Sequence, residues 1–144
     1  MKLVVERSFW TQASTSDAFA FLGDFRNAEE WDPGTRICEL KTGQVGAGAT
    51  YRNVSTFLGR SVELTYTTLG YEADRALHFR GTNKSFRGDD HLSLSHAGVG
   101  SQIEYRAEYE LRGPAKLVTP VVAAYLPRLA DRTVRQLKRT LDRL

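Results

Sequence analysis

Alternation of apolar and polar residues dominates the middle of the chain. It is clearest over residues 101–111, whose apolar positions are Ile103, Tyr105, Ala107, Tyr109 and Leu111. A period of two is typical of a strand in a sheet with one covered and one solvent-facing side. Glycine, asparagine and aspartate turn signals separate further segments of this kind. The predicted strands are 2–10, 36–42, 49–58, 60–72, 76–82, 88–96 and 101–111.

Two short helices are expected between the first two strands. Ser14 followed by Asp17 resembles a helix N-cap with an acidic residue in the first turn, and Gly23 is a plausible C-cap. A second helix near residues 26–30 should end at Trp31-Asp32-Pro33, because the residue before a proline is disfavoured in helical geometry.

The last segment has a helical period. Apolar residues recur from Leu126 to Leu144 at spacings of three and four, which predicts an amphipathic helix over 128–144. Pro120 and Pro127 are expected to break or kink the chain before it. The order of elements is that of an α+β protein, with helices on one face of an antiparallel sheet.

Composition narrows the class of protein. The chain has 144 residues, a net charge of +3 and one cysteine, which indicates a single domain over 1–144 without a disulfide framework or a cysteine zinc cluster. The modest charge does not point to nucleic acid. Charged residues at the start and the lack of a long apolar run predict a soluble, cytoplasmic protein with Cys38 reduced.

Several segments together resemble the START-like superfamily, in particular its polyketide cyclase/dehydrase and lipid-transport group, also called SRPBCC proteins. The segments are Trp31-Asp32-Pro33, Val45-Gly46-Ala47-Gly48, Phe57-Leu58-Gly59-Arg60, Ala76–Gly81, Gly100-Ser101 and the basic terminal helix. The resemblance spans roughly residues 3–143. It rests on the order in which these segments occur and not on any one of them. It implies a helix-grip (Bet v 1-like) fold, in which a seven-stranded curved sheet wraps a long C-terminal helix around a deep apolar cavity.

Aromatic residues in phase with apolar neighbours are the first candidates to line that cavity, with Asn53 and Ser55 as polar groups orienting a ligand. The predicted ligand-binding residues are Trp31, Tyr51, Asn53, Ser55, Phe57, Tyr66, Phe79, Leu94, Tyr105 and Tyr109. An alternative stays open for each kind of residue. The tyrosines can be ordinary core residues, and Trp31 can pin its loop instead of closing the cavity mouth.

Metal, cofactor and nucleotide chemistry find little support in the residue spacing. His91 and His96 fall on opposite faces of one strand, and His78 is expected to face solvent, so no metal site or cofactor is predicted. Asp89 and Asp90 are adjacent in a predicted strand, so their side chains point to opposite faces of the sheet. The one that faces the cavity is a candidate partner of Arg80 or of a ligand. The glycines at 43–48 precede a strand, which favours a turn over a phosphate-binding loop.

Two functions compete. The first is binding or transport of a hydrophobic small molecule, such as a lipid, polyketide or isoprenoid. The alternative is an aromatase/cyclase-type enzyme, in which Tyr66, Tyr105 or Asp90 would have to act as acid or base. A protein-interaction role is supported only by the basic terminal helix.

The terminal helix concentrates the positive charge. Residues 128–144 carry six basic and two acidic side chains. The pattern fits a solvated outer helix face, and it also fits transient contact with an anionic membrane surface.

Overall fold

The computed structural model describes residues 2–144 as one antiparallel sheet with helices on one side. The strands are β1 (Lys2–Thr11), β2 (Thr35–Thr42), β3 (Thr50–Phe57), β4 (Arg60–Glu72), β5 (Ala76–Thr82), β6 (Phe86–Ala97) and β7 (Gly100–Leu111). The helical elements are α1 (Thr15–Gly23), η1 (Phe25–Asn27), α2 (Ala28–Trp31), η2 (Gly113–Val118) and α3 (Thr119–Leu141). The predicted α+β architecture is confirmed, and each predicted strand agrees with the observed one to within two residues at either end.

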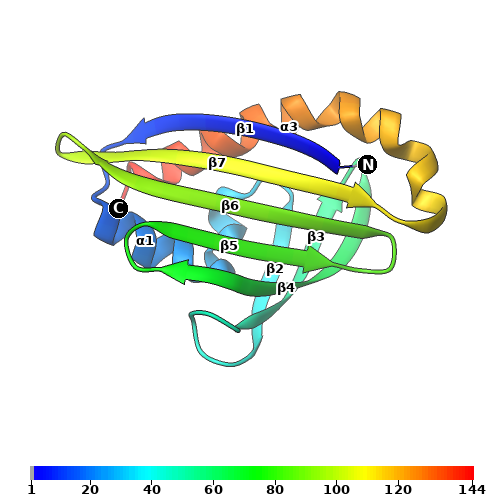
Figure 1. The fold of residues 1–144 in the computed structure, drawn as a ribbon, viewed down its shortest axis with the longest axis horizontal. Helices are drawn as coiled ribbons and strands as arrows, with labels where there is room; N and C mark the ends of the chain where they lie inside the picture. The colour runs from blue at the N-terminus through cyan, green and yellow to red at the C-terminus, as the bar shows by residue number, and fades with distance from the viewer. Residues whose placement is uncertain (1) are drawn as a thin grey trace.

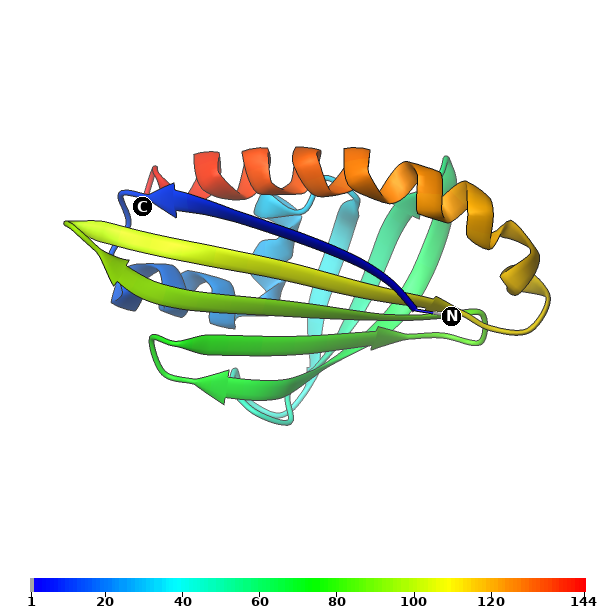
Figure 2. The ribbon, with the colours of Figure 1, turned by 45° about the horizontal axis from the view of Figure 1, so that its top comes forward.

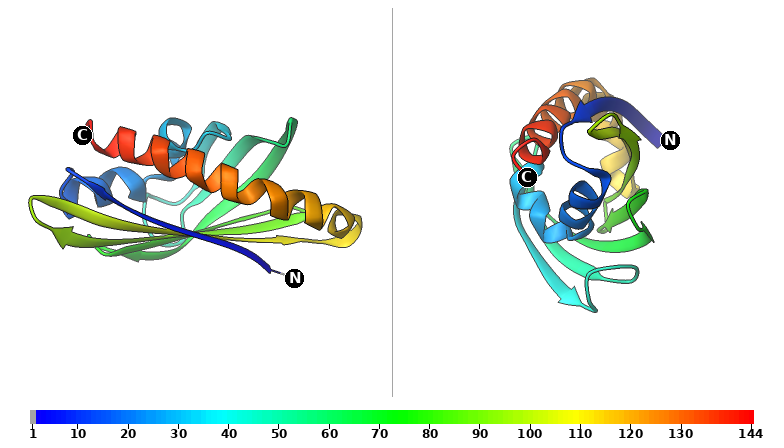
Figure 3. Two further views of the ribbon diagram at one scale, coloured as in Figure 1. Left: turned by 90° about the horizontal axis from the view of Figure 1, so that it is seen from above. Right: turned by 90° about the vertical axis from the view of Figure 1, so that its left-hand side faces the viewer.

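The sheet is strongly curved. Its strands follow the order β1-β7-β6-β5-β4-β3-β2, so the first strand pairs with the last (Figure 1). Seen end on, the strands form an arc with α1 and α3 on the concave side (Figure 3). Helix α3 runs along the length of the sheet beside β1 (Figure 2).

The segment after β1 folds as its sequence predicts. The Ser14 hydroxyl accepts a hydrogen bond from the amide of Asp17, which caps α1. The expected second helix is split into the 3-10 turn η1 and one turn of α2, which ends at Trp31 before Asp32-Pro33. Phe25, Ala28 and Trp31 of this segment are buried against the sheet.

Helix α3 is longer than predicted. It begins at Thr119, continues through Pro127 and ends at Leu141, so the predicted bounds of 128–144 are wrong and the chain is not broken before residue 128. Pro120 lies in the first turn, where its missing amide hydrogen costs nothing. Pro127 and the residue whose carbonyl it leaves unpaired, Ala123, are both exposed, so water can solvate that carbonyl.

Buried apolar side chains form two clusters along the concave side. The larger joins α1, η1 and α2 to the middle strands and to the C-terminal half of α3. The smaller joins Val122 and Leu126 of α3 to Leu111, with Phe57 and Phe86 packed against them. The residues discussed next face the same side of the sheet as these clusters.

The turn between β3 and β4 has an unusual residue at its first position. Leu58 adopts φ 51° and Gly59 adopts φ 79°. Positive φ at both central residues matches the twist of a hairpin, but a leucine is strained there.

Candidate functional site

A row of aromatic side chains and glycines crosses the concave face. Strand pairing places Tyr51 opposite Tyr66, Tyr66 opposite Gly81, Gly81 opposite Gly88, and Gly88 opposite Tyr109. A Cβ on Gly81 would lie 2.5 Å from Cζ of Tyr66, so the Tyr66 ring lies directly over that glycine. Gly81 therefore allows the ring to lie flat on the sheet.

Phe25 of η1 fills the space above these rings. Its ring centroid lies 4.5 Å from those of both Tyr66 and Phe79, and 5.8 Å from that of Tyr51. Trp31 packs edge-on against Phe25 at 6.2 Å and is 2% exposed. This end of the concave side is therefore an aromatic core, and the burial of Trp31 favours its pinning role over a cavity mouth.

Past this aromatic cluster, the concave side carries one carboxylate in the middle of the sheet. Asp90 lies opposite Phe79 and Ala107, both fully buried, so it faces inward. The Tyr105 hydroxyl donates a hydrogen bond to Asp90 Oδ1 at 3.2 Å. Asp90, Tyr66 and Tyr109 are half-buried, so each retains some accessible surface.

The surroundings of Asp90 favour its protonated form. Burial is the main cause, and the nearby Asp32 and Asp89 carboxylates add to it, while the Tyr105 hydrogen bond opposes it; together they raise the pKa of Asp90 to about 7. Burial and the Asp90 charge also hold the pKa values of Tyr66, Tyr105 and Tyr109 above their usual range. The site thus has one group able to gain or lose a proton near neutral pH.

Asp32, from the end of α2, is the second acidic group near this site. It accepts hydrogen bonds from the Thr35 hydroxyl at 2.8 Å and the Gly34 amide at 3.1 Å. Burial raises its pKa, against those two hydrogen bonds and the Arg132 charge. Its oxygens are engaged in the turn before β2, so Asp90 is the carboxylate with more freedom to meet a ligand.

Three buried polar atoms on the concave side have no hydrogen-bond partner among the described residues. They are Trp31 Nε1, the Tyr51 hydroxyl and the Thr68 hydroxyl. Buried polar groups are nearly always paired with protein, water or ligand. These groups extend the polar character of the site from Asp90 toward β3 and α2.

The remaining predicted ligand-binding residues lie around this centre. Asn53 is buried, and its side chain accepts a hydrogen bond from the Ser55 hydroxyl at 2.6 Å. Leu94 is buried in the larger apolar cluster. Phe57 lies at the other end, against Tyr125 of α3 with ring centroids 5.5 Å apart. The predicted set therefore faces one side of the sheet but spreads over both clusters, and Phe25 and Asp90 are missing from it.

Side chains on the convex face differ from two predictions made from the sequence, one for the partner of Arg80 and one for the surroundings of His78. Arg80 pairs with the outward-facing Asp89, at 2.8 Å from Nε to Oδ1, and not with the inward-facing aspartate. His78 faces outward as expected, but it is not free in solvent. Its Nε2 lies 2.7 Å from Asp89 Oδ1, and its ring stacks on His91 with centroids 4.0 Å apart. The sequence argument considered His91 together with His96 on the same strand. The histidine that lies close to His91 is His78, on the neighbouring strand.

The curved sheet, the long helix packed on its concave side and the enclosed aromatic face define a helix-grip, START-like protein. The chain belongs to the polyketide cyclase / dehydrase and lipid transport family, whose model matches residues 2–142. No curated protein sequence matches the chain.

Solved structures share this fold at low sequence identity. A START superfamily protein from Mycobacterium smegmatis matches over 97% of both chains, with a TM-score of 0.81 and 13% identity. The Zhui aromatase/cyclase from Streptomyces sp. R1128 matches over 99% of this chain and 95% of its own, with a TM-score of 0.83 and 13% identity. The di-domain ARO/CYC StfQ from the steffimycin biosynthetic pathway matches over 96% of this chain and 50% of its own, with a TM-score of 0.72 and 14% identity. At these identities the likeness establishes the fold.

Within residues 2–144, none of the helices has the length and apolar character needed to cross a membrane.

Proposed function

We propose that the concave side binds a hydrophobic small molecule that carries at least one polar group. The observation behind the proposal is the inward-facing Asp90, which accepts a hydrogen bond from the buried Tyr105, lies among aromatic side chains and is itself only half-buried. An apolar wall with a few placed polar groups is the usual composition of a small-molecule site. A hydroxyl or carbonyl of the ligand would meet Asp90, while its apolar body lies along Tyr109 and the part of Tyr66 that Phe25 leaves accessible.

The protonation state of Asp90 determines which polar group it prefers. Below its pKa of about 7 the carboxyl donates a hydrogen bond to a carbonyl, and above it the carboxylate accepts one from a hydroxyl. The pH dependence of binding therefore reports the chemistry of the ligand. Charged groups near Asp90 are Asp32 and Asp89, and the hydroxyls around it belong to the tyrosines of β4 and β7.

Native mass spectrometry of freshly purified protein, followed by extraction of whatever co-purifies, tests this proposal. A bound small molecule is expected, with reduced occupancy in Asp90→Asn and Tyr105→Phe. The matched control is Asp74→Asn, because Asp74 is exposed in the β4–β5 turn. Unloaded protein that also binds no member of a lipid and polyketide panel would contradict the proposal.

A second candidate function is ring closure or dehydration of a polyketide-like substrate. The specific observation that favours it is the pKa of Asp90, which suits a general acid or base at neutral pH, next to the Tyr105 hydroxyl. Incubation with a poly-β-ketone mimic tests it. A product rate above buffer that falls in Asp90→Asn supports catalysis, and a rate equal to buffer rejects it.

The outer face of α3 carries a related proposal, transient contact with an anionic membrane surface during ligand exchange. Arg128, Arg132, Arg135 and Arg139 are exposed along the helix. Each basic residue close to such a surface contributes about 1 kcal/mol. Flotation with anionic liposomes at low salt, lost at high salt, is the expected result; no flotation at low salt contradicts the proposal.

A further inference from the structure

Three metal-ligating side chains meet on the convex face, on the opposite side of the sheet from the concave site. His78, Asp89 and His91 each offer one ligand atom, and these atoms lie within 4.8 Å of one another. Asp89 is 4% exposed, while the His78 side chain is 24% exposed and His91 is half-buried. The carboxylate is therefore covered by its neighbours, and the two imidazoles are more accessible than the carboxylate.

The hairpin of β5 and β6 creates this arrangement. His78 pairs directly with His91 across the hairpin, and Asp89 lies two residues before His91, on the same face. On the other side of His78 its strand neighbour is Gly70 of β4, which has no side chain to crowd the ring. The three ligands thus come from a rigid sheet, with room beside one imidazole for it to turn.

We propose that His78, Asp89 and His91 form a binding site for a divalent transition-metal ion of the zinc type. Two imidazole nitrogens and one carboxylate oxygen are ligands that zinc accepts in a four-coordinate site with one position left for water. In such a tetrahedral site neighbouring ligand atoms are about 3.4 Å apart, which follows from bond lengths of about 2.1 Å. His78 Nε2 and Asp89 Oδ1, now 2.7 Å apart, would separate slightly to admit the ion.

Two arginines compete with a metal ion for the carboxylate. Arg80 Nε lies 2.8 Å from Asp89 Oδ1, and Arg87 Nε lies 3.4 Å from Asp89 Oδ2. Arg87, on Oδ2, orients Asp89 as an outer-shell partner does, whereas Arg80 occupies the oxygen that would face the ion, and the charge of both opposes a cation. Glu108 lies opposite Asp89 on β7 and supplies a compensating negative charge, shared with Arg106 and Lys2. Affinity should therefore rise when Arg80 is replaced.

Titration of chelator-treated protein with zinc chloride, followed by calorimetry, tests the site, with cobalt(II) as a spectroscopic probe. One ion should bind per chain, with the visible absorption of four-coordinate cobalt. His78→Gln and His91→Gln are expected to lose affinity by about tenfold or more, since each removes one of three ligands. Arg80→Gln is expected to bind more tightly than the wild type.

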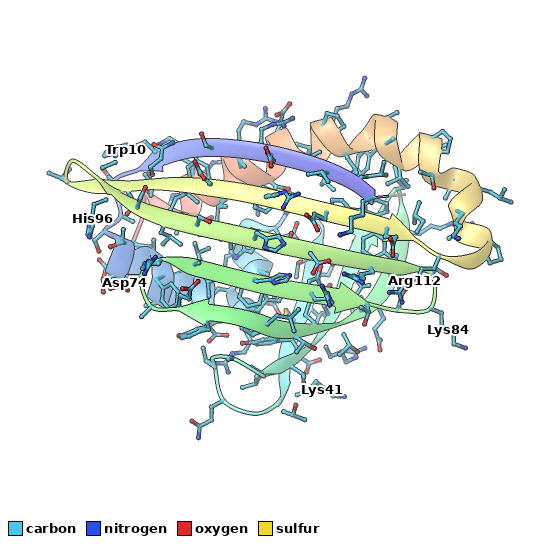
Figure 4. The ribbon with its side chains drawn as sticks, in the orientation of Figure 1. Trp10, Lys41, Asp74, Lys84, His96 and Arg112 are labelled. Atoms are coloured by element: carbon cyan, nitrogen blue, oxygen red, sulfur yellow. The ribbon has the colours of Figure 1, made fainter. Side chains whose placement is uncertain are left out.

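His96→Gln is the matched control, because the chain has only three histidines and the third lies near the β6–β7 turn, at the end of the sheet occupied by Trp10 (Figure 4). Its affinity should equal that of the wild type. Circular dichroism and the melting temperature of each variant show that the sheet is intact. The proposal is overturned by zinc binding weaker than about 0.1 mM in the wild type, or by equal affinity in His78→Gln, His91→Gln and His96→Gln.

Discussion

The ring of Phe25 lies 4.5 Å, centroid to centroid, from the ring of Tyr66, so a residue of a short 3-10 turn packs onto the middle of the sheet. Phe25 is 1% exposed and also contacts Phe79 and Trp31. It therefore limits how much of the concave side a ligand can occupy. The size of this one side chain is a determinant of ligand size in the proposed site.

Phe25→Ala should lower the free energy of unfolding by about 3–5 kcal/mol, because it removes a fully buried ring. Phe25→Leu should cost less and leave more room on the concave side. Urea denaturation measures the first effect, and the mass of co-purified ligand measures the second. A loss below about 1 kcal/mol for Phe25→Ala would show that neighbouring rings refill the space.

Asp90 should make the protein less stable as pH rises. The unfolded carboxyl releases its proton near pH 4, whereas the folded one holds it to about pH 7. Between these values the folded state binds more protons, so the free energy of unfolding falls with increasing pH, by about 1.4 kcal/mol for each pH unit. Above pH 7 this contribution is constant.

Asp90→Asn removes this titration. The difference in unfolding free energy between Asp90→Asn and the wild type should grow in favour of the variant from pH 4 to pH 7, as measured by denaturation at several pH values. Asp74→Asn, in an exposed turn, is the control and should show no such trend. A constant difference across this range would mean that Asp90 titrates as an ordinary aspartate.

Gly81→Ala should displace the Tyr66 ring, since the new methyl group would lie 2.5 Å from it. A loss of about 1–3 kcal/mol in unfolding free energy is expected for such overpacking. In a double-mutant cycle with Tyr66→Leu, the cost of the alanine should shrink, because the smaller side chain leaves room. Additive effects of the two substitutions would contradict this contact.

Leu58→Asn should stabilise the protein. Asparagine tolerates the positive φ that Leu58 adopts, and Leu58 is 42% exposed, so little apolar burial is lost. An increase of about 0.5–1 kcal/mol is expected, seen as a higher denaturation midpoint at unchanged slope. Leu69→Asn is the control: that leucine is 46% exposed in a strand, where asparagine should bring no gain.

The strands and the long helix were predictable because their patterns are local. Period-two alternation located β7, and spacings of three and four located α3. The start of α3 was not predictable in this way, because the proline rule treats Pro127 as a helix boundary, whereas α3 continues through it and leaves the Ala123 carbonyl at an exposed position. Resemblance to a family supplied the curvature, which no residue pattern encodes.

The centre of the site was harder to predict, because it depends on contacts between distant segments. Phe25 lies in a three-residue turn with no periodicity, so nothing in the sequence aims it at Tyr66. The pKa of Asp90 depends on Asp32, Tyr105 and burial by other elements. The pairing of His78 with His91 also depends on the exact turn: the Asn83 amide donates to the Phe86 carbonyl at 2.9 Å, and counting outward from this hydrogen bond aligns the two histidines.

The pairing of β1 with β7 has a consequence for how the chain acquires its structure. Lys2 lies opposite Glu110, so the first strand has no partner until nearly all the other strands have been synthesised. Helix α3, which packs beside β1, arrives later still. Contacts so distant along the chain slow folding and leave apolar strand edges open to association. On the ribosome, Leu3, Val5 and Phe9 are then a stretch that a chaperone would be expected to protect.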